Sequence, residues 1–424
     1  MTAAPMEIDA DSVDLSDIDG FWTKPIEYRH AAFAALRARP GLPFYPEPTN
    51  FLLPPGPGYY ALTRMDDIVT ASRYSKVYIS GKGATSASDL PAEFNEFYGS
   101  MINMDDPRHA RLRRIVSRGF TPRRLDALTD SVAELATRIV DDVVDSTAEF
   151  DAVTEISARL PLTIVCDLMG IPESQHRFVF DRTNVILGAT DPEYVPDADN
   201  ILVALMQSGQ ELATLMHELA AERKKRPTDD LTSALLNAHV DGEALTPDEL
   251  ASFFILLVVA GNETTRNAIS WGIHLLTENP DQRAIWLKDL AGVTPGAVEE
   301  IVRWASPVSF MRRTIADDVE PFELSGQRLE PGDKLLMFYG SANRDESHFT
   351  DPDRFDVLRS PNVHVGFGGP GPHFCLGAHL ARREISVMFR ELLSRVPNIH
   401  ATGRPVQLKS AFINGIKHLP VTIG

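Results

Sequence analysis

One long helix limits the fold of this chain more than any other feature. The segment Thr246-Pro247-Asp248-Glu249 has the residues of an N-terminal capping box, with proline at the first helical position. Helical spacing then continues to about Glu278, where Asn279-Pro280 ends it, over roughly 30 residues or ~45 Å. Residues 253–260 are apolar on every side of this helix, which predicts that it runs through the core of a large helical domain.

The rest of the chain predicts a mainly α fold with small β-sheets (α+β). Residues 107–290 have mostly helical spacing, and a last strong helix is expected from Ala378 to about Leu393. Short strand-like stretches occur near the start, as at residues 58–63, and again after Pro307, as at residues 334–339. No repeat, low-complexity segment or Ser/Gly-rich linker divides the chain. We therefore expect one domain over residues 21–424, preceded by an acidic N-terminal tail, residues 1–20.

Charge and cysteine content exclude several classes of function. The formal net charge of −18 repels nucleic-acid phosphates and anionic membrane surfaces, so no nucleic-acid partner is expected. No apolar run approaches the ~20 residues of a membrane span, and the N-terminus lacks the pattern of a signal peptide. Two cysteines, Cys166 and Cys375, cannot form a disulfide framework or a cysteine-rich zinc site. These features suit a cytoplasmic protein that acts on a small molecule or on another protein.

The apolar pattern of the long helix is interrupted by Ala260-Gly261-Asn262-Glu263-Thr264-Thr265. Glycine is a poor helix former, and a buried glutamate is unfavourable unless it has a partner. Local conflicts of this kind tend to mark functional sites. The alternative for Thr264 is a structural hydroxyl bonded back to the preceding turn, which bends a helix.

A second unusual segment, residues 365–377, is rich in glycine and proline and leads into the last helix. Cys375 lies at or near the start of that helix, where free N–H groups and the helix dipole stabilise a thiolate. A thiolate on a rigid loop suits a metal ligand. The alternatives are a small buried side chain and a phosphate-binding loop, and the second fails because no Gly-Lys-Ser/Thr follows. Cys166 is expected in the core because its neighbours are apolar.

This loop resembles the haem-binding signature of the cytochrome P-450 superfamily, Phe-Gly-x-Gly-x-His-x-Cys-x-Gly. Phe367 lies eight residues before Cys375, one more than in the general pattern, as in one actinobacterial subgroup. The resemblance implies a single large helical domain with a smaller β-rich region. It also implies haem b (iron protoporphyrin IX), with the Cys375 thiolate as the axial ligand of the iron. Further implied haem contacts are Ala260, Gly261, Phe367, Gly368 and Gly377.

Two side chains one helical turn apart, His109 and Arg113, can together clamp carboxylates. The family resemblance makes these carboxylates the haem propionates and adds Arg313 and His373 as further contacts. Without the resemblance, such an arginine-rich stretch is more often a solvated helix face.

The segment Glu300-Ile301-Val302-Arg303 resembles the Glu-x-x-Arg pair of the family. Residues three apart share a helix face, so the two side chains can form an ion pair. Arg354 resembles the third member of a structural triad. The implied role of this triad is to hold the haem-loop region in place.

The interrupted helix resembles the oxygen-activating segment of the family, Ala-Gly-x-Asp/Glu-Thr. This implies a monooxygenase with O2 as co-substrate, in which Thr264 donates a hydrogen bond to the bound oxygen and Glu263 relays protons from solvent. Gly261 is expected to leave room for dioxygen beside the helix. The rival is a haem protein that binds or senses a ligand without turnover, and such a protein does not need Glu263 or Thr264.

Within the family, the chain resembles mycobacterial monooxygenases of methyl-branched lipids, most clearly at residues 252–270, 299–308 and 412–421. Those relatives oxidise the terminal carbon of branched fatty acids, isoprenoids and cholestane side chains. The leading hypothesis is therefore omega-hydroxylation of a methyl-branched lipid, and the alternative is oxidation of a polyketide or terpenoid secondary metabolite. Candidate pocket residues, each with a plain core position as the alternative, are Met101, Ile102, Asn103, Met104, Leu257, Val258, Phe412 and Ile413.

The source of electrons is implied as well. The chain has no flavin or iron–sulfur motif, and one cysteine besides the haem ligand cannot hold a cluster. Electrons must therefore come from separate proteins, and the resemblance implies a ferredoxin and its NAD(P)H-dependent reductase. Arg382 and Arg383 could offer an acidic ferredoxin a local positive patch.

Overall fold

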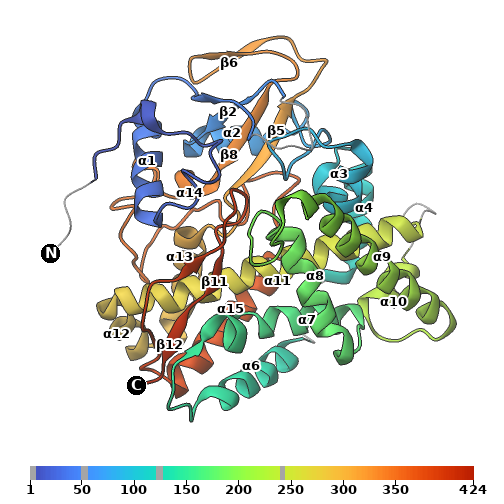
Figure 1. The fold of residues 1–424 in the computed structure, drawn as a ribbon, viewed down its shortest axis with the longest axis vertical. Coiled ribbons are helices and arrows are strands. Elements are labelled where there is room, and N and C mark those ends of the chain that lie inside the picture. Colours follow the sequence, from blue (N-terminus) through green and yellow to red (C-terminus); the bar gives the residue numbers. More distant parts are fainter. Residues whose placement is uncertain (1–5, 49–55, 121–127, 239–243) are drawn as a thin grey trace.

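Helices make up most of the structure, and α11 crosses the whole molecule (Figure 1). The computed structural model describes residues 6–48, 56–120, 128–238 and 244–424. The helices are α1 (Ile26–Ala38), α2 (Met65–Arg73), α3 (Ala92–Gly99), α4 (Arg108–Ser117), α6 (Thr129–Val143), α7 (Arg159–Met169), α8 (His176–Leu187), α9 (Ile201–Lys225), α10 (Leu231–Leu236), α11 (Pro247–Glu278), α12 (Pro280–Lys288), α13 (Leu290–Ala305), α14 (Tyr339–Ala342) and α15 (Ala378–Arg395).

The strands are short and gather in small sheets. They are β1 (Phe44–Tyr45), β2 (Tyr59–Leu62), β3 (Tyr78–Ile79), β4 (Phe150–Asp151), β5 (Phe310–Ile315), β6 (Phe322–Leu324), β7 (Gln327–Leu329), β8 (Lys334–Phe338), β9 (His400–Ala401), β10 (Val406–Gln407), β11 (Ile416–His418) and β12 (Pro420–Thr422). The largest sheet has the order β1-β2-β8-β5-β3, in which β2 and β8 are parallel and the other neighbours antiparallel. The predicted mainly α fold with small sheets is confirmed, as are the strands expected at 58–63 and 334–339.

The predicted long helix is α11, and its ends follow the expected chemistry. The Glu249 backbone N–H donates to Thr246 Oγ1 (3.1 Å), and the Thr246 N–H donates to Glu249 Oε2 (2.9 Å), which completes the capping box. The helix has 32 residues and ends at Asn279, immediately before Pro280. No helix within the described ranges is long and apolar enough to cross a membrane.

The polar interruption of α11 falls between two apolar cores. The first half of the helix, residues 250–258, packs with α4, α7 and α9 in one cluster of buried side chains. The second half, residues 268–276, packs with α6, α13 and α15 in another. Residues 260–265 therefore lie between the two parts of α11 that pack in the apolar cores.

The acidic N-terminal segment is packed against the domain over its described part, residues 6–20, rather than extending from it as a tail. Val13 and Leu15 are buried, and Trp22 Nε1 donates to the Leu15 carbonyl (2.9 Å). Trp22 also stacks on Phe338 of β8. Apolar side chains spaced between the carboxylates give this segment its contacts.

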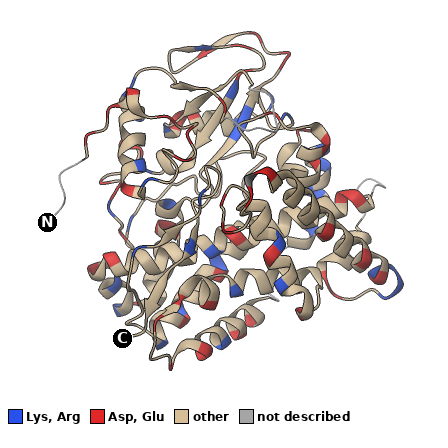
Figure 2. Ribbon diagram, viewed as in Figure 1, with Lys and Arg blue, Asp and Glu red and all other residues tan. Residues whose placement is uncertain are grey.

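Over the molecule as a whole, acidic and basic residues are interspersed, not separated into blocks (Figure 2).

Candidate active site

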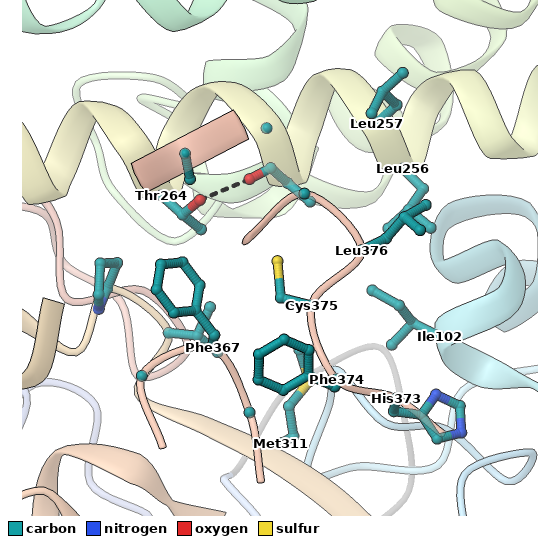
Figure 3. Close-up of a pocket in the computed structure, with 18 of the residues that line it drawn as sticks. Ile102, Leu256, Leu257, Thr264, Met311, Phe367, His373, Phe374, Cys375 and Leu376 are labelled. Carbon is teal, nitrogen blue, oxygen red and sulfur yellow. Dashed lines mark hydrogen bonds between the residues drawn. The ribbon is translucent and has the colours of Figure 1, made fainter. Parts of the chain in front are cut away.

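Cys375 is carried by a loop whose shape depends on glycines. Gly368 and Gly371 have φ angles of +87° and +153°, and a Cβ atom on Gly371 would lie 2.2 Å from the Ser72 carbonyl oxygen of α2. The Cys375 backbone N–H donates to the Phe367 carbonyl at 3.0 Å, which closes the loop on itself. The Cys375 sulfur consequently points toward α11 (Figure 3).

The Cys375 side chain is exposed to the cavity between its loop and α11. Burial raises the pKa of this thiol, while the backbone N–H of Gly377 and the positive charges of Arg113 and Arg382 act to lower it. The helix start thus favours the thiolate, as the sequence predicts, but burial outweighs that effect. A thiolate here needs a cation beside the sulfur, which suits a metal ligand.

The cavity lies between the Cys375 loop and α11 and is mostly apolar. Most of the residues that the sequence proposes as haem or pocket contacts line it: Met101, Ile102, His109, Arg113, Leu257, Ala260, Gly261, Thr264, Arg313, Phe367, Gly368, His373, Cys375 and Gly377. These residues come from five separate parts of the chain, and the fold brings them together around one space.

One end of the cavity is lined by basic side chains. The rings of His109 and His373 lie 4.2 Å apart, and Arg113 Nη2 donates to the Phe374 carbonyl at 2.6 Å. Burial, then the charges of Arg313, His109 and Arg113, lower the pKa of His373 to about 2. Burial also lowers the pKa of His109. Both imidazoles are therefore neutral, and the two arginines supply the positive charge.

Two buried nitrogen atoms at this end, His109 Nε2 and Arg313 Nε, have no hydrogen-bond partner. Arg313 is only 3% exposed and bonds otherwise to a backbone carbonyl. His109 Nδ1 lies 3.3 Å from Asp106 Oδ1, so the neutral ring donates there and its Nε2 atom is an acceptor. The Arg313 Nε–H is a buried donor without an acceptor, which is unfavourable, so this end of the cavity fits a group with carboxylates. The Cys375 sulfur, the apolar walls and the arginines at this end together match a haem with its propionates.

Comparison with known proteins settles the family. The family model described as cytochrome P-450 matches residues 62–286 and 287–403. The chain belongs to the cytochrome P-450 family. A methyl-branched lipid omega-hydroxylase of Mycobacterium tuberculosis is 48% identical over 422 residues, covering 99% of this chain and 96% of that protein. A steroid C26-monooxygenase of Rhodococcus jostii is 39% identical, covering 96% of this chain and 84% of that protein.

The fold of this P-450 also matches solved structures. Cytochrome P-450 CYP268A2 of Mycobacterium marinum, in complex with pseudoionone, has a TM-score of 0.91 and 41% identity, with full coverage of both chains. The protein is thus a cytochrome P-450 monooxygenase, and its family uses a haem-thiolate group and O2. Cys375, with the four basic residues at the end of the cavity, is where this P-450 can hold that group.

Some proposed pocket residues of the P-450 lie away from the cavity. Met104 and Val258 are buried in the apolar core. Val258 faces away from the cavity because one step along α11 from Leu257 turns a side chain to another face of the helix. Asn103 is buried and bonds to the backbone of Ala84 (2.8 Å) and of Asn95 (2.9 Å). Phe412 packs on Phe310 (ring centroids 5.5 Å apart), and Ile413 forms a β-bridge with Val308.

Other cavity residues were not proposed from the sequence. Along α11 they follow the helical spacing from Leu257 and Thr264, which could have identified them: Phe253, Leu256, Thr265 and Ala268. The rest come from neighbouring elements and carry no motif of their own: Phe120, Val302, Pro307, Val308, Met311, Tyr339, Gly366, Phe374, Leu376, Ala381 and Ile385.

Thr264 lines the cavity and faces the Cys375 side (Figure 3). Its hydroxyl donates to the Ala260 carbonyl at 2.7 Å, which is the back-bonded arrangement considered from the sequence. Gly261 also borders the cavity, but a Cβ atom there would lie 2.9 Å from Val165 Cγ2 of α7. The missing side chain of Gly261 therefore makes room for the neighbouring helix.

Glu263 is 1% exposed and does not line the cavity. Its Oε1 atom accepts hydrogen bonds from Arg266 Nη2, in a close ion pair, and from Asn267 Nδ2 (3.2 Å). Its Oε2 atom has no partner, and neither polar atom of the fully buried Asn262 has one. Arg266 in turn donates to Asn184 Oδ1 of α8 at 2.9 Å. This polar network lies behind Thr264 as seen from the cavity.

A second buried carboxyl group, Glu384 of α15, has no counterpart in the motifs. It is 2% exposed, and its Oε1 atom has no hydrogen-bond partner. Burial raises the pKa of Glu384 to about 8, against a smaller lowering by a hydrogen bond with Thr265. Thr265 borders the cavity, so a neutral acid lies directly behind its wall.

The structural triad differs from expectation in its third member. Arg303 donates to both oxygens of Glu300, each at 2.7 Å, and both side chains are fully buried. The third member is Arg359, whose Nε lies 3.2 Å from the Glu300 carboxylate. Arg354 is exposed and contributes only its carbonyl. The non-repetitive path of residues 351–360 decides which arginine turns inward, and spacing alone could not predict it.

The two arginines after Cys375 are engaged within the protein. Arg382 pairs with Glu299 at 2.5 Å and lies 4.2 Å from the centre of the Phe367 ring. Arg383 donates to Thr129 Oγ1 at 2.8 Å. Both therefore help to hold α15 against the Cys375 loop, α13 and α6.

Proposed function

We propose that this monooxygenase hydroxylates the terminal carbon of a methyl-branched lipid, and that a branched sterol side chain is its second class of substrate. The observation that carries the proposal is the apolar cavity wall formed by Leu256 and Leu257 of α11 and by Ile102 beside the Cys375 loop (Figure 3). The 48% identity to a methyl-branched lipid omega-hydroxylase and the 39% identity to a steroid C26-monooxygenase support it.

When bound, the haem-thiolate group supplies the chemistry that inserts one oxygen atom of O2 into a C–H bond. Cys375 would hold the iron, and His109, Arg113, Arg313 and His373 would hold the propionates. Inner C–H bonds are weaker than terminal ones, so terminal attack must be enforced by position. The apolar wall would do this by excluding the inner carbons from the reacting position.

Glu263 and Thr264 would deliver protons to the cavity. With its own hydrogen committed to the Ala260 carbonyl, Thr264 Oγ1 presents lone pairs to the cavity and accepts a hydrogen bond there. To donate instead, the hydroxyl must rotate away from Ala260. Glu263 would supply the proton after its side chain leaves Arg266, or through water in the polar network around Asn262.

Electrons would come from NAD(P)H through a ferredoxin reductase and a ferredoxin. The docking face would include the surface of α15 near Arg382 and Arg383, which lies behind the Cys375 loop. An acidic ferredoxin would have to compete with Glu299 for Arg382, and the contact would weaken at high salt.

The first test is an absorption spectrum of the reduced protein with carbon monoxide. The strongly red-shifted Soret band of thiolate-ligated haem is expected in the wild type and in Cys166→Ala, and is expected to be absent in Cys375→Ser. Its absence in haem-loaded wild-type protein would overturn the assignment of Cys375.

The second test addresses the substrate. Titration with methyl-branched lipids is expected to shift the haem from low to high spin, and reconstituted turnover to place the hydroxyl on the terminal carbon. Leu257→Ala is expected to admit attack at inner carbons. The matched control, Val258→Ala, lies next to it on α11 but away from the cavity, and should keep terminal selectivity. No spin shift with any lipid would count against the lipid proposal.

A further inference from the structure

A second cavity lies between α1, the end of α13, the residues after α14 and the loop before β11. Its volume is about 30 Å³, above the about 10–15 Å³ that one water molecule requires. Its walls combine aromatic and small polar side chains with three basic residues, Arg29, His30 and Arg344. None of these residues borders the Cys375 cavity.

Arg29 is a buried cation that forms no ion pair among the described residues, although the charge of Glu27 acts on it. Its side chain is 4% exposed, and no Asp or Glu among the described residues forms an ion pair with it. Its Nη2 atom donates to two amide oxygens, those of Gln407 (2.6 Å) and Asn414 (3.4 Å). Its Nε atom has no hydrogen-bond partner among the residues that the structure describes.

Arg344 is the second buried cation. It is 1% exposed and lies 4.7 Å from the centre of the Trp304 ring. It donates to the carbonyls of Trp304 (3.0 Å) and Gly340 (3.4 Å). The carboxylate of Asp353 is 77% exposed and lies 3.5 Å from Nε, and the charge of Glu300 also acts on Arg344. Nε makes no hydrogen bond with any described residue.

The surrounding charges do not compensate the two arginines. Arg37 and Arg303 also face His30, but the carboxylates of Glu346 and Glu300 are already bound to them in pairs of hydrogen bonds. Burial, followed by the charge of Arg344 and those of the other arginines, lowers the pKa of His30 well below its usual value. His30 is therefore neutral, and its ring can donate one hydrogen bond.

Two buried guanidinium groups with unused N–H donors need an anion, because an uncompensated buried charge is strongly unfavourable. We propose that this cavity binds one small monovalent anion of halide size, chloride in the cell. A halide accepts hydrogen bonds from several directions without needing a planar partner. The anion would tie α1 to α13 and to the loop before β11.

The first test measures stability against chloride. Urea unfolding of the haem-loaded protein is followed at constant ionic strength while sodium gluconate is replaced by sodium chloride; guanidinium chloride is unsuitable because it supplies the ligand. The folding equilibrium constant is expected to rise about tenfold for each tenfold increase in chloride above the dissociation constant. A response that is flat in chloride would overturn the proposal.

Two variants separate the site from general salt effects. Arg29→Met is expected to lose the chloride response. Arg283→Met should keep it, since Arg283 is a half-buried arginine with an unpaired Nε that does not line the cavity. A chloride response that persists in Arg29→Met would overturn the assignment.

If Arg29→Met fails to fold, diffraction decides the matter on the wild type. Crystals grown with sodium bromide are expected to show an anomalous peak between Arg29 and Arg344. Water alone at that position would overturn the proposal.

Discussion

The two buried carboxyl groups beside the cavity, Glu263 and Glu384, differ in how the protein accommodates them. Glu263 lies in α11 and is held by Arg266 three residues later, with Asn267 as a second donor. Glu384 lies in α15, has no cationic partner in the described part of the chain, and is neutral because burial raises its pKa to about 8. Each sits next to a threonine that borders the cavity, Thr264 in one case and Thr265 in the other.

The difference shows two ways of keeping an acid inside a protein. An ion pair holds the charge in place and keeps a proton acceptor available, whereas an unpaired site removes the charge and keeps a proton bound. One site can contain both a proton acceptor and a proton donor when the environments of two acidic groups give them different protonation states. Substitutions at the two positions should therefore have different consequences.

The largest effect is expected from Arg266→Met, which leaves Glu263 without its cation. A buried pair broken on one side loses about 3–5 kcal/mol of unfolding free energy. Urea unfolding of the haem-loaded protein measures the loss. The double variant Glu263→Gln/Arg266→Met should recover most of it. A loss below about 1 kcal/mol, the range of exposed pairs, would show that Glu263 is not compensated by Arg266.

The next largest effect is expected on catalysis. Glu263→Gln keeps the shape of the side chain but removes its acid function, and product formation should fall on the order of 10²-fold. Glu384→Gln is the matched control and should change the rate by no more than a few-fold. Turnover with a saturating electron supply measures both. Equal losses of turnover in the two variants would show that the two carboxyl groups do not differ in function.

The pH dependence of stability should identify Glu384. Its folded pKa of about 8 lies above its ordinary value of 4.5, so between these pH values the folded protein binds a proton that the unfolded chain has lost. Its contribution to stability therefore falls as pH rises, by up to about 1.4 kcal/mol per pH unit. Unfolding measured from pH 5 to pH 8 should show this slope in the wild type. In Glu384→Gln the slope should be smaller, and the variant should be more stable than the wild type at pH 8.

The smallest effect is expected from Thr265→Val, which removes the hydroxyl beside Glu384 while keeping the side-chain shape. The lost hydrogen bond should reduce the unfolding free energy by about 1 kcal/mol. Because this bond lowers the pKa of Glu384, its loss should extend the pH slope to higher pH. In a Glu384→Gln background the effect of Thr265→Val on the pH slope should vanish. A persisting shift of the slope would mean that another group titrates there.

Much of the fold could be predicted because its signals are local. The capping box at Thr246 and the proline after Asn279 set the ends of α11 through contacts within a few residues of each end. The Cys375 loop is similarly local, since its glycines permit the positive φ angles that the loop requires. Residues that line the cavity along α11 follow from helix geometry once one of them is known.

The remaining features depend on contacts between distant segments. Arg359 replaces Arg354 at Glu300 because of the path of an irregular turn. Glu384 becomes a neutral acid only because α11 and α15 pack together and exclude both water and cations. Arg29 and Arg344, more than 300 residues apart in the chain, likewise meet only in the folded protein. Sequence periodicity predicts which face of a helix is buried but not which polar groups meet there.

The order in which the chain is synthesised gives the Cys375 cavity a further property. Among the described residues, its lining begins at Met101 and ends at Ile385 of α15. At ~5–20 residues per second, a ribosome needs roughly 15–60 s to pass from one to the other. His109 and Arg113, and later the first half of α11, are synthesised before the Cys375 loop that completes the site. Cofactor insertion is therefore a late event in the biosynthesis of this protein, and a premature stop before residue 375 yields a chain that cannot bind haem through its thiolate at all.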